Sequence, residues 1–278
     1  MGQIFGSLIK KTMDELEYEK CKICNSKAEK IFNAIILNKY KVSYLKCSYC
    51  NFIFTEKPYW LEESYKLPIN IGDTGELNRN INSSLITSII VLLFFNKNKS
   101  FLDYAAGHGL FVRRMRDIGF NFFWFDPFTE NKFAKGFEKV LNSKEKYELV
   151  TAFECLEHIE NPISTIEKIL LDTENILFST NIVPEPTPNP QSWWYYGLDH
   201  GQHISLYSKK SMQILAENFG LNYYTKNNYH LFTKRKINNF IFKLSIYLIS
   251  KLPKILSLPG MTSKIESDHL LLTKNEYH

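Results

Sequence analysis

The sequence contains no long hydrophobic run and few cysteines for its 278 residues. Its longest purely apolar run, residues 89–95, is far shorter than the about 20 residues that a membrane-spanning helix needs. The N-terminal stretch MGQIFGSLIKK lacks the apolar core and cleavage site of a secretory signal, and Gly6 stands where a myristoylation signal carries Ser or Thr. We therefore expect a cytoplasmic protein with reduced thiols and no transmembrane segment.

The sequence also lacks a strong excess of one charge. It holds 34 Lys and Arg against 29 Asp and Glu, a net charge of +5, and no dense stripe of basic residues. This mild balance suits an acidic ligand but is weak evidence for nucleic acid, so we do not expect a nucleic-acid partner. With 44% hydrophobic and 23% charged residues, the chain can bury one sizeable core plus a small appendage.

Four of the five cysteines form two pairs, CKIC and CSYC, with 22 residues between them. A two-residue spacing lets both thiolates face one ion about 2.3 Å away, and two such pairs complete a tetrahedron. We predict that Cys21, Cys24, Cys47 and Cys50 bind a structural Zn²⁺. Disulfides are disfavoured in the cytoplasm. Cys155 stands alone in an apolar stretch and is predicted to be a core thiol.

Three segments follow from these patterns: an N-terminal tail (1–19), a zinc ribbon (20–58) and an α/β domain (59–278). A ribbon of this size has little core of its own, so metal binding would supply its folding energy. Within the larger domain, residues 234–262 are predicted to form a helical insertion before the last strand. The lysine-containing apolar stretch 236–258 also suits peripheral contact with a membrane.

Beyond a polar connector predicted over residues 61–82, strand and helix patterns alternate. Asn161 before Pro162 is a typical helix start. We expect strands over 100–104, 120–125, 147–153, 176–180, 223–233 and 269–273, and helices over 82–95, 109–118, 162–170 and 208–219. Such alternation predicts an α/β fold with a doubly wound, mostly parallel sheet covered on both faces.

A glycine loop follows the first of these strands in FLDYAAGHGLF. Gly107 and Gly109 let the backbone approach a ligand closely, and the next helix points free N–H groups at it. Asp126 ends the following strand, about 20 residues further on, where a carboxylate can accept hydrogen bonds from both hydroxyls of a ribose. The order of these parts predicts nucleoside binding at the carboxyl ends of parallel strands.

LDYAAGHG resembles the first motif of class I S-adenosylmethionine-dependent methyltransferases, in which D-x-G-x-G-x-G is usual. The resemblance covers about residues 60–232. It extends to small-molecule methyltransferases with a zinc-ribbon prefix, through INIGDTGELNRN and WWYYGLDHGQHISLYS. It implies a Rossmann-like methyltransferase sheet, S-adenosylmethionine as methyl donor, and a small-molecule or glycan acceptor. A sugar, a nucleotide-sugar or a precursor in surface-polysaccharide biosynthesis fits best.

The resemblance also implies a cofactor-binding set. Asp103 would lie near the amino-acid end of the cofactor, Asp126 would hold its ribose, and Phe128 would pack near its adenine. Ala105 stands in place of the first glycine of the motif, and Arg79 would reach the cofactor carboxylate. The full implied set is Asp103, Ala105, Gly107, Gly109, Asp126, Phe128, Glu154 and Arg79.

A cluster of carboxylates and histidine follows in FECLEHIENP. It resembles E-x-x-E-H in ubiquinone-pathway and small-RNA 2′-O-methyltransferases, in which these side chains hold a divalent ion. Glu154 and His158 would share a face if the segment is helical, and His203 is the candidate that completes the site.

Three interpretations of this cluster stay open. Glu154, Glu157, His158 and His203 bind Mg²⁺, Mn²⁺ or Fe²⁺; or His158 or His203 acts as a general base without metal; or Glu157 and His158 only brace the loop. The catalytic candidates are therefore His158, His203 and Glu157. The aromatic run 193–196 would form either a lid or core packing. A nucleic-acid methyltransferase with an RNA-contacting ribbon, and a non-catalytic cofactor-binding protein, are the alternative functions.

Overall fold

The computed structural model describes residues 18–66, 73–140, 146–251 and 270, and the chain divides into two compact units. Unit 1 comprises Met1–Tyr65, Leu156–Ile166 and Asn181–Gly220. Unit 2 comprises Lys66–Cys155, Glu167–Thr180 and Leu221–His278. The sequence predicted a boundary near residue 58 and one continuous second domain. In the structure, two later segments instead join the unit that contains the cysteine pairs.

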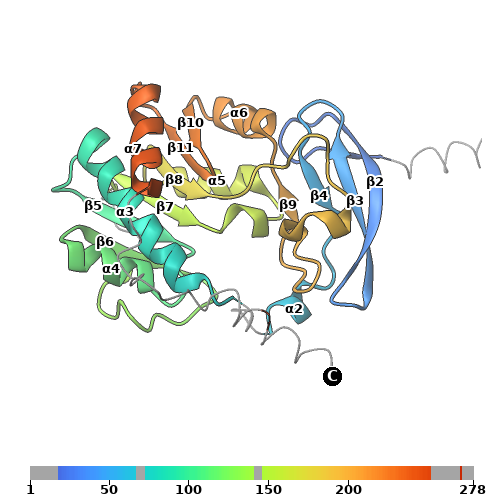
Figure 1. Ribbon diagram of the computed structural model, residues 1–278, viewed down its shortest axis with the longest axis horizontal. Coiled ribbons are helices and arrows are strands. Elements are labelled where there is room, and N and C mark those ends of the chain that lie inside the picture. Colours follow the sequence, from blue (N-terminus) through green and yellow to red (C-terminus); the bar gives the residue numbers. More distant parts are fainter. Residues whose placement is uncertain (1–17, 67–72, 141–145, 252–269, 271–278) are drawn as a thin grey trace, which may run out of the picture. The chain divides into compact units, whose positions relative to one another are not determined.

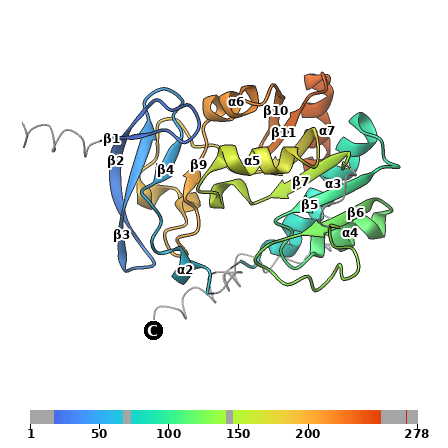
Figure 2. The same ribbon diagram turned by 180° about the vertical axis from the view of Figure 1, so that it is seen from behind.

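Unit 1 is built on a five-stranded sheet with the order β1-β2-β3-β4-β9 (Figures 1 and 2). Its strands are β1 (Tyr18–Lys20), β2 (Lys27–Ile36), β3 (Tyr40–Cys47), β4 (Ile53–Thr55) and β9 (Ser205–Leu206). Strands β2 and β3 form the segment between the two cysteine pairs, and β3 ends at Cys47. Antiparallel pairing of β4 with β9 brings Ile53 opposite Leu206, so a distant segment completes the ribbon sheet.

Short helices complete unit 1: α2 (Leu61–Ser64), η1 (Leu156–His158), η2 (Pro190–Ser192), η3 (Trp194–Tyr196) and α6 (Lys209–Glu217). Ser208 caps α6, as predicted, by accepting a hydrogen bond from the Ser211 N–H. The core of the unit is aromatic and contains Tyr44, Trp60, Tyr195 and Tyr196. The tyrosines of the run 193–196 therefore pack in the core, whereas Trp194 is 77% exposed.

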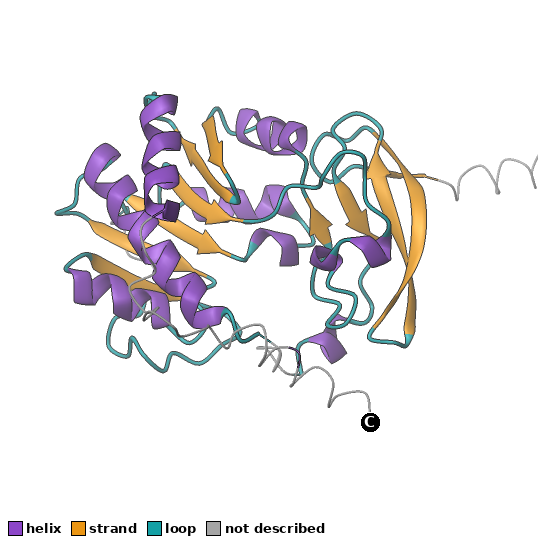
Figure 3. Cartoon of the chain, in the orientation of Figure 1, coloured by secondary structure: helices purple, strands orange, loops and turns teal. Residues whose placement is uncertain are grey.

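Unit 2 contains a six-stranded sheet with the order β10-β11-β8-β7-β5-β6 (labels in Figure 1, strands in orange in Figure 3). Its strands are β5 (Ser100–Tyr104), β6 (Asn121–Phe125), β7 (Leu149–Phe153), β8 (Asn175–Ser179), β10 (Asn222–Lys226) and β11 (Tyr229–Thr233). Strands β5 to β8 are parallel, and β11 is antiparallel to β8. The predicted strand 223–233 is wrong in one respect: a turn with Asn227 at φ +56° splits it into a hairpin.

Helices cover both faces of this sheet, which confirms the predicted doubly wound α/β fold. On one face, α3 (Glu76–Phe94), α4 (Leu110–Ile118) and α7 (Asn239–Lys251) share a hydrophobic core with the strands (Figure 1). On the other face lies α5 (Pro162–Leu170), whose second half belongs to unit 2 (Figure 2). Asn161 caps α5 by accepting from the Ser164 N–H at 3.2 Å.

The helices differ from the predictions at their ends. Helix α3 begins at Glu76, inside the connector predicted over residues 61–82, so the polar residues between Glu76 and Asn82 already belong to the helix. By length and composition α3 could cross a membrane, although a third of its most apolar window is buried and Ile86, Ile90 and Val91 lie in the core. The predicted insertion is helical in α7. Of the predicted strand 269–273 only Leu270 lies within the described residues, and it is helical rather than extended.

Candidate active site

The turn between β5 and α4 holds three residues in the left-handed backbone region. They are Ala105 (φ +57°), Gly107 (φ +52°) and Gly109 (φ +87°). A Cβ placed on Gly107 would meet no described atom within 4 Å, so the backbone there borders open space. The turn therefore leaves bare backbone beside open space at the carboxyl end of β5, next to the first N–H groups of α4. We call this place the hollow; it is where nucleoside ligands bind in parallel α/β sheets.

Gly109 is crowded on the side where a Cβ would stand. A Cβ at this position would lie 2.9 Å from Asn131 Oδ1, 3.1 Å from Ala134 Cβ and 3.2 Å from the Trp124 ring. The absence of a side chain thus allows the 131–134 loop to pack on the start of α4. Gly109 shapes the hollow through this packing, while Gly107 is the glycine that borders the ligand space.

Asp126 lies at the hollow, as the sequence predicted. Its Oδ2 accepts a hydrogen bond from the Gly107 N–H at 2.9 Å, and its Oδ1 accepts from the N–H groups of Phe128 and Thr129, both at 2.8 Å. These bonds use three of the about four acceptor positions of a carboxylate. Asp126 can accept one ribose hydroxyl directly, and a second requires release of the Gly107 bond.

The other predicted cofactor residues of unit 2 differ in their exposure. Asp103 is buried and accepts a hydrogen bond from Thr151 Oγ1 at 2.6 Å, and burial raises its pKa to about 8. Phe128 is 91% exposed, so its ring is available to stack on a ligand but is not fixed. The Arg79 guanidinium pairs with Asp73, with 2.7 Å between Nη1 and Oδ1, and would have to exchange this partner for a cofactor carboxylate.

Glu154 does not share a helical face with His158, which corrects the sequence-based interpretation. It follows β7 directly and has a left-handed backbone with φ +47°, and the helical turn begins only at Leu156. Its carboxylate accepts a hydrogen bond from Ser179 Oγ at 2.5 Å, and the same hydroxyl accepts from the Glu154 N–H. Both residues belong to unit 2, so Glu154 stays a candidate for cofactor binding rather than for the metal group.

In unit 1, Glu157, His158 and His203 form a compact group. Each offers one ligand atom, and these atoms all lie within 4.8 Å of one another. The His158 and His203 rings are 4.9 Å apart, and Glu157 and His203 are buried. Burial and the nearby His200 lower the pKa of His158 to about 4, and burial lowers that of His203 as well. Both imidazoles are therefore neutral at pH 7.

Tyr195 holds two members of this group, a role that the sequence did not reveal. Its hydroxyl donates to Glu157 Oε1 at 2.6 Å, and its carbonyl oxygen lies 2.7 Å from His203 Nδ1. A carbonyl can only accept, so Nδ1 carries the proton and Nε2 presents a lone pair. The Tyr65 hydroxyl lies 3.2 Å from His158 Nδ1. The only sequence signal for Tyr195 was its place in the aromatic run before His203.

The four paired cysteines also come together in unit 1. Their sulfur atoms lie within 4.8 Å of one another, with 3.5 Å between Cys21 and Cys50 and between Cys24 and Cys47. Four sulfurs 2.3 Å from one zinc ion would be about 3.8 Å apart. The N–H groups of Ile23 and Tyr49 donate to the sulfurs of Cys21 and Cys47. The cluster is thus compatible with the predicted structural Zn²⁺, and Cys155 is buried apart from it, as predicted.

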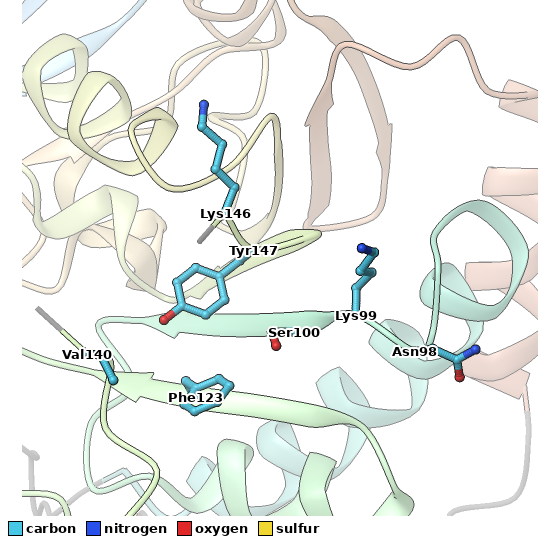
Figure 4. Close-up of a pocket in the computed structure, with 7 residues that line it drawn as sticks. All are labelled: Asn98, Lys99, Ser100, Phe123, Val140, Lys146 and Tyr147. Atoms are coloured by element: carbon cyan, nitrogen blue, oxygen red, sulfur yellow. The ribbon is translucent and has the colours of Figure 1, made fainter. Parts of the chain in front are cut away.

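A separate pocket of about 390 Å³ lies at the amino ends of the unit 2 strands (Figure 4). Its lining contains none of the predicted site residues and consists of Asn98, Lys99, Ser100, Phe123, Val140, Lys146 and Tyr147. Since Ser100 begins β5 and the glycine loop follows its other end, this pocket is distinct from the hollow beside Asp126.

Comparison with known proteins identifies one family. The model of a methyltransferase domain matches residues 77–226, which is more than half of the chain. Among curated proteins, none matches.

Several solved structures match part of this chain. Human N-acetylserotonin methyltransferase in complex with SAM matches with 14% identity and a TM-score of 0.43, over 56% of this chain and 52% of that one. CalO1, a methyltransferase in calicheamicin biosynthesis with SAH bound, matches with 12% identity and a TM-score of 0.39, over 55% of this chain and 54% of that one. The pyocyanin biosynthetic protein PhzM matches with 9% identity and a TM-score of 0.40, over 54% of this chain and 53% of that one. The chain thus spans about half the length of each.

Proposed function

This chain belongs to the methyltransferase-domain family, and from that premise we propose that it transfers a methyl group from S-adenosylmethionine to a hydroxyl group of a small molecule. The observation that carries the proposal is the hollow at Gly107, with the Asp126 carboxylate hydrogen-bonded to its backbone. When bound, the cofactor supplies an electrophilic methyl group on a sulfonium, which is already a good leaving group. The protein then has to position the acceptor and remove its proton.

The donor site is tested by calorimetry with S-adenosylmethionine. Asp126→Ala should weaken binding by about 1.5–3 kcal/mol, because a charged hydrogen-bond acceptor is lost. Asp117→Ala, an exposed carboxylate on α4 of the same unit, is the matched control and should leave binding unchanged. If Asp126→Ala binds the cofactor like the wild type, the ribose assignment is wrong. If the wild type binds none, the proposed donor is wrong.

For the acceptor, we propose that Glu157, His158 and His203 hold a divalent first-row metal ion. Three features support this. The ligand atoms of the three residues converge, Tyr195 hydrogen-bonds Glu157 and His203, and both imidazoles are neutral. Two imidazoles and one carboxylate suit Mn²⁺, Fe²⁺ or Zn²⁺ better than Mg²⁺. Such an ion lowers the pKa of a bound hydroxyl. A metal-free base would be better served by a pKa near 7 than by the value of about 4 at His158.

Metal content distinguishes the two mechanisms. The wild type should contain two ions per chain, one at the cysteines and one at the histidines. Glu157→Gln should lose only the second ion and its methyl transfer, while Cys24→Ser should lose the first ion and, since both groups lie in unit 1, disturb the second as well. A wild type with one ion that keeps full turnover after treatment with a mild chelator would favour His203 as a metal-free general base.

The acceptor class that we propose is a sugar, a nucleotide-sugar or a surface-polysaccharide precursor. The support is the resemblance to zinc-ribbon small-molecule methyltransferases, together with the exposed Trp194 ring, since flat aromatic faces pack against sugar rings. A screen with methyl-labelled cofactor against nucleotide-sugars, glycans, other hydroxyl compounds and RNA tests it. Transfer to RNA alone would contradict the proposal. The cytoplasmic location expected from the sequence stays a prediction.

A further inference from the structure

Helix α7 carries an exposed apolar stripe on the side that faces away from the core of unit 2. Phe240 is 72% exposed, Leu248 55% and Tyr247 47%, and Ile241 and Leu244 are also exposed. The spacing of these positions places them along one side of the helix. We call these five residues the α7 stripe. The opposite side, with Phe242 and Ile246, is buried, so the helix is apolar on both sides.

A second exposed apolar group lies on the neighbouring helix. Helices α3 and α7 lie side by side in both views (Figures 1 and 2), and the rings of Phe94 and Phe242 join them with centroids 6.5 Å apart. Leu92 and Leu93, in the last turn of α3, are 54% and 50% exposed. Single exposed apolar residues are common, but five along one side of α7, with two more on the helix packed against it, are typical of an interaction surface.

The charges around the α7 stripe are all positive. Residues 236–265 contain no Asp or Glu, and Lys236, Lys243 and Lys251 are exposed on or beside α7. Two acidic groups that lie beside the basic residues just before α7 are already paired: Glu174 with Lys234, and Glu148 with Arg235. An apolar stripe flanked by lysines complements a surface that is apolar below and anionic above, which describes a bilayer of anionic lipids.

We propose that the α7 stripe docks the protein on an anionic lipid surface, with α7 lying in the plane of the membrane. The stripe enters the boundary between headgroups and acyl chains, and the lysines contact lipid phosphates. This surface is separate from the hollow beside Asp126 and from the Glu157 group, so it adds a location to the proposed reaction without taking part in it. An acceptor carried by a lipid would be presented at such a surface.

The test measures co-sedimentation of the full chain with two vesicle types, phosphatidylcholine alone and phosphatidylcholine with phosphatidylglycerol in roughly a three-to-one ratio. The wild type should bind the anionic vesicles and lose binding at high salt. Leu244→Glu with Leu248→Glu should reduce binding at least about tenfold. Lys243→Glu should reduce it by about fivefold or more, since each lysine near the surface is worth about that factor.

Leu171→Glu is the matched control, because Leu171 is also in unit 2 and 72% exposed but lies outside the stripe. It should bind anionic vesicles like the wild type. The proposal fails if the wild type binds neither vesicle type, or if the double variant binds as the wild type does. It also fails if light scattering shows a dimer that the double variant abolishes, since a second copy then covers the stripe. Cofactor binding, measured by calorimetry without lipid, confirms that each variant is folded.

Discussion

At the scale of the residue, Tyr195 links two members of the group formed by Glu157, His158 and His203. It donates to Glu157 through its hydroxyl and accepts from His203 through its backbone carbonyl. Only the hydroxyl bond can be removed by substitution. Because such supporting bonds orient a ligand or a base, we predict that Tyr195 acts as a positioning residue rather than a catalytic one.

Tyr195→Phe should lower kcat by about 10- to 100-fold, because the Glu157 carboxylate loses its buried hydrogen-bond donor. Cofactor affinity should not change. Tyr196→Phe is the matched control: this neighbouring buried tyrosine donates to the Pro188 carbonyl, and its loss should leave kcat nearly unchanged. An equal fall of kcat in both variants would show that the effect is one of packing alone.

Asp103 makes stability depend on pH. Burial raises its pKa from an ordinary value near 3.8 to about 8. Between these values the folded protein keeps a proton that the unfolded chain has lost, so stability should fall as pH rises through this window. Asp103→Asn should flatten the fall between about pH 4 and 8, as measured by urea denaturation. A variant with the same slope as the wild type would refute the raised pKa.

At the scale of the element, the β5–α4 turn depends on glycine for two separable reasons. Gly109 and Gly136 share a φ of +87°, but only at Gly109 would a Cβ meet other atoms closer than 3.2 Å. The pair therefore separates backbone strain from crowding.

Gly109→Ala should lower the free energy of unfolding by about 1–3 kcal/mol more than Gly136→Ala does, because it adds crowding against Asn131 to the same backbone cost. Thermal melts of the two variants measure the difference. Gly109→Ala should also weaken cofactor binding, since the loop that borders the hollow has to shift. Equal melting temperatures for the two variants would mean that the loop gives way freely.

At the scale of the whole molecule, the cysteine cluster and the group formed by Glu157, His158 and His203 belong to one unit. Cys47 ends β3, and the sheet that contains β3 is completed by β9, which begins two residues after His203. Loss of zinc should therefore disturb Glu157 and His203 as well as the two cysteine pairs. The hollow beside Asp126, in contrast, is built entirely from unit 2.

Zinc removal by a strong chelator should unfold unit 1 first and abolish methyl transfer, while cofactor binding by unit 2 persists. Tryptophan fluorescence reports this step, because Trp60, Trp193 and Trp194 lie in unit 1 and Trp124 lies in unit 2. Cys155→Ser should leave the transition unchanged, since that thiol is not in the cluster. Simultaneous loss of cofactor binding and fluorescence would show that the two units unfold together.

Local patterns predicted the parts of the fold that local physics controls. Strand β5, the glycine turn and Asp126 follow one another within about 25 residues, so their order alone placed the carboxylate at the hollow. The prediction for Glu154 failed because it assumed a helix where Glu154 takes a left-handed conformation. Its hydrogen bonds to Ser179, which is 25 residues away in the chain, accompany that conformation and have no local signal.

The sequence by itself determined the class of fold, the glycine turn and the pairing of the four clustered cysteines, because each depends on short spacings whose geometry is fixed by the backbone. Only the tertiary structure decided that residues 156–166 and 181–220 join the ribbon, that Glu157 meets His203, and that Tyr195 holds both. The physical reason is that these contacts come from the packing of segments far apart in the chain, and no periodicity in either segment encodes the partner.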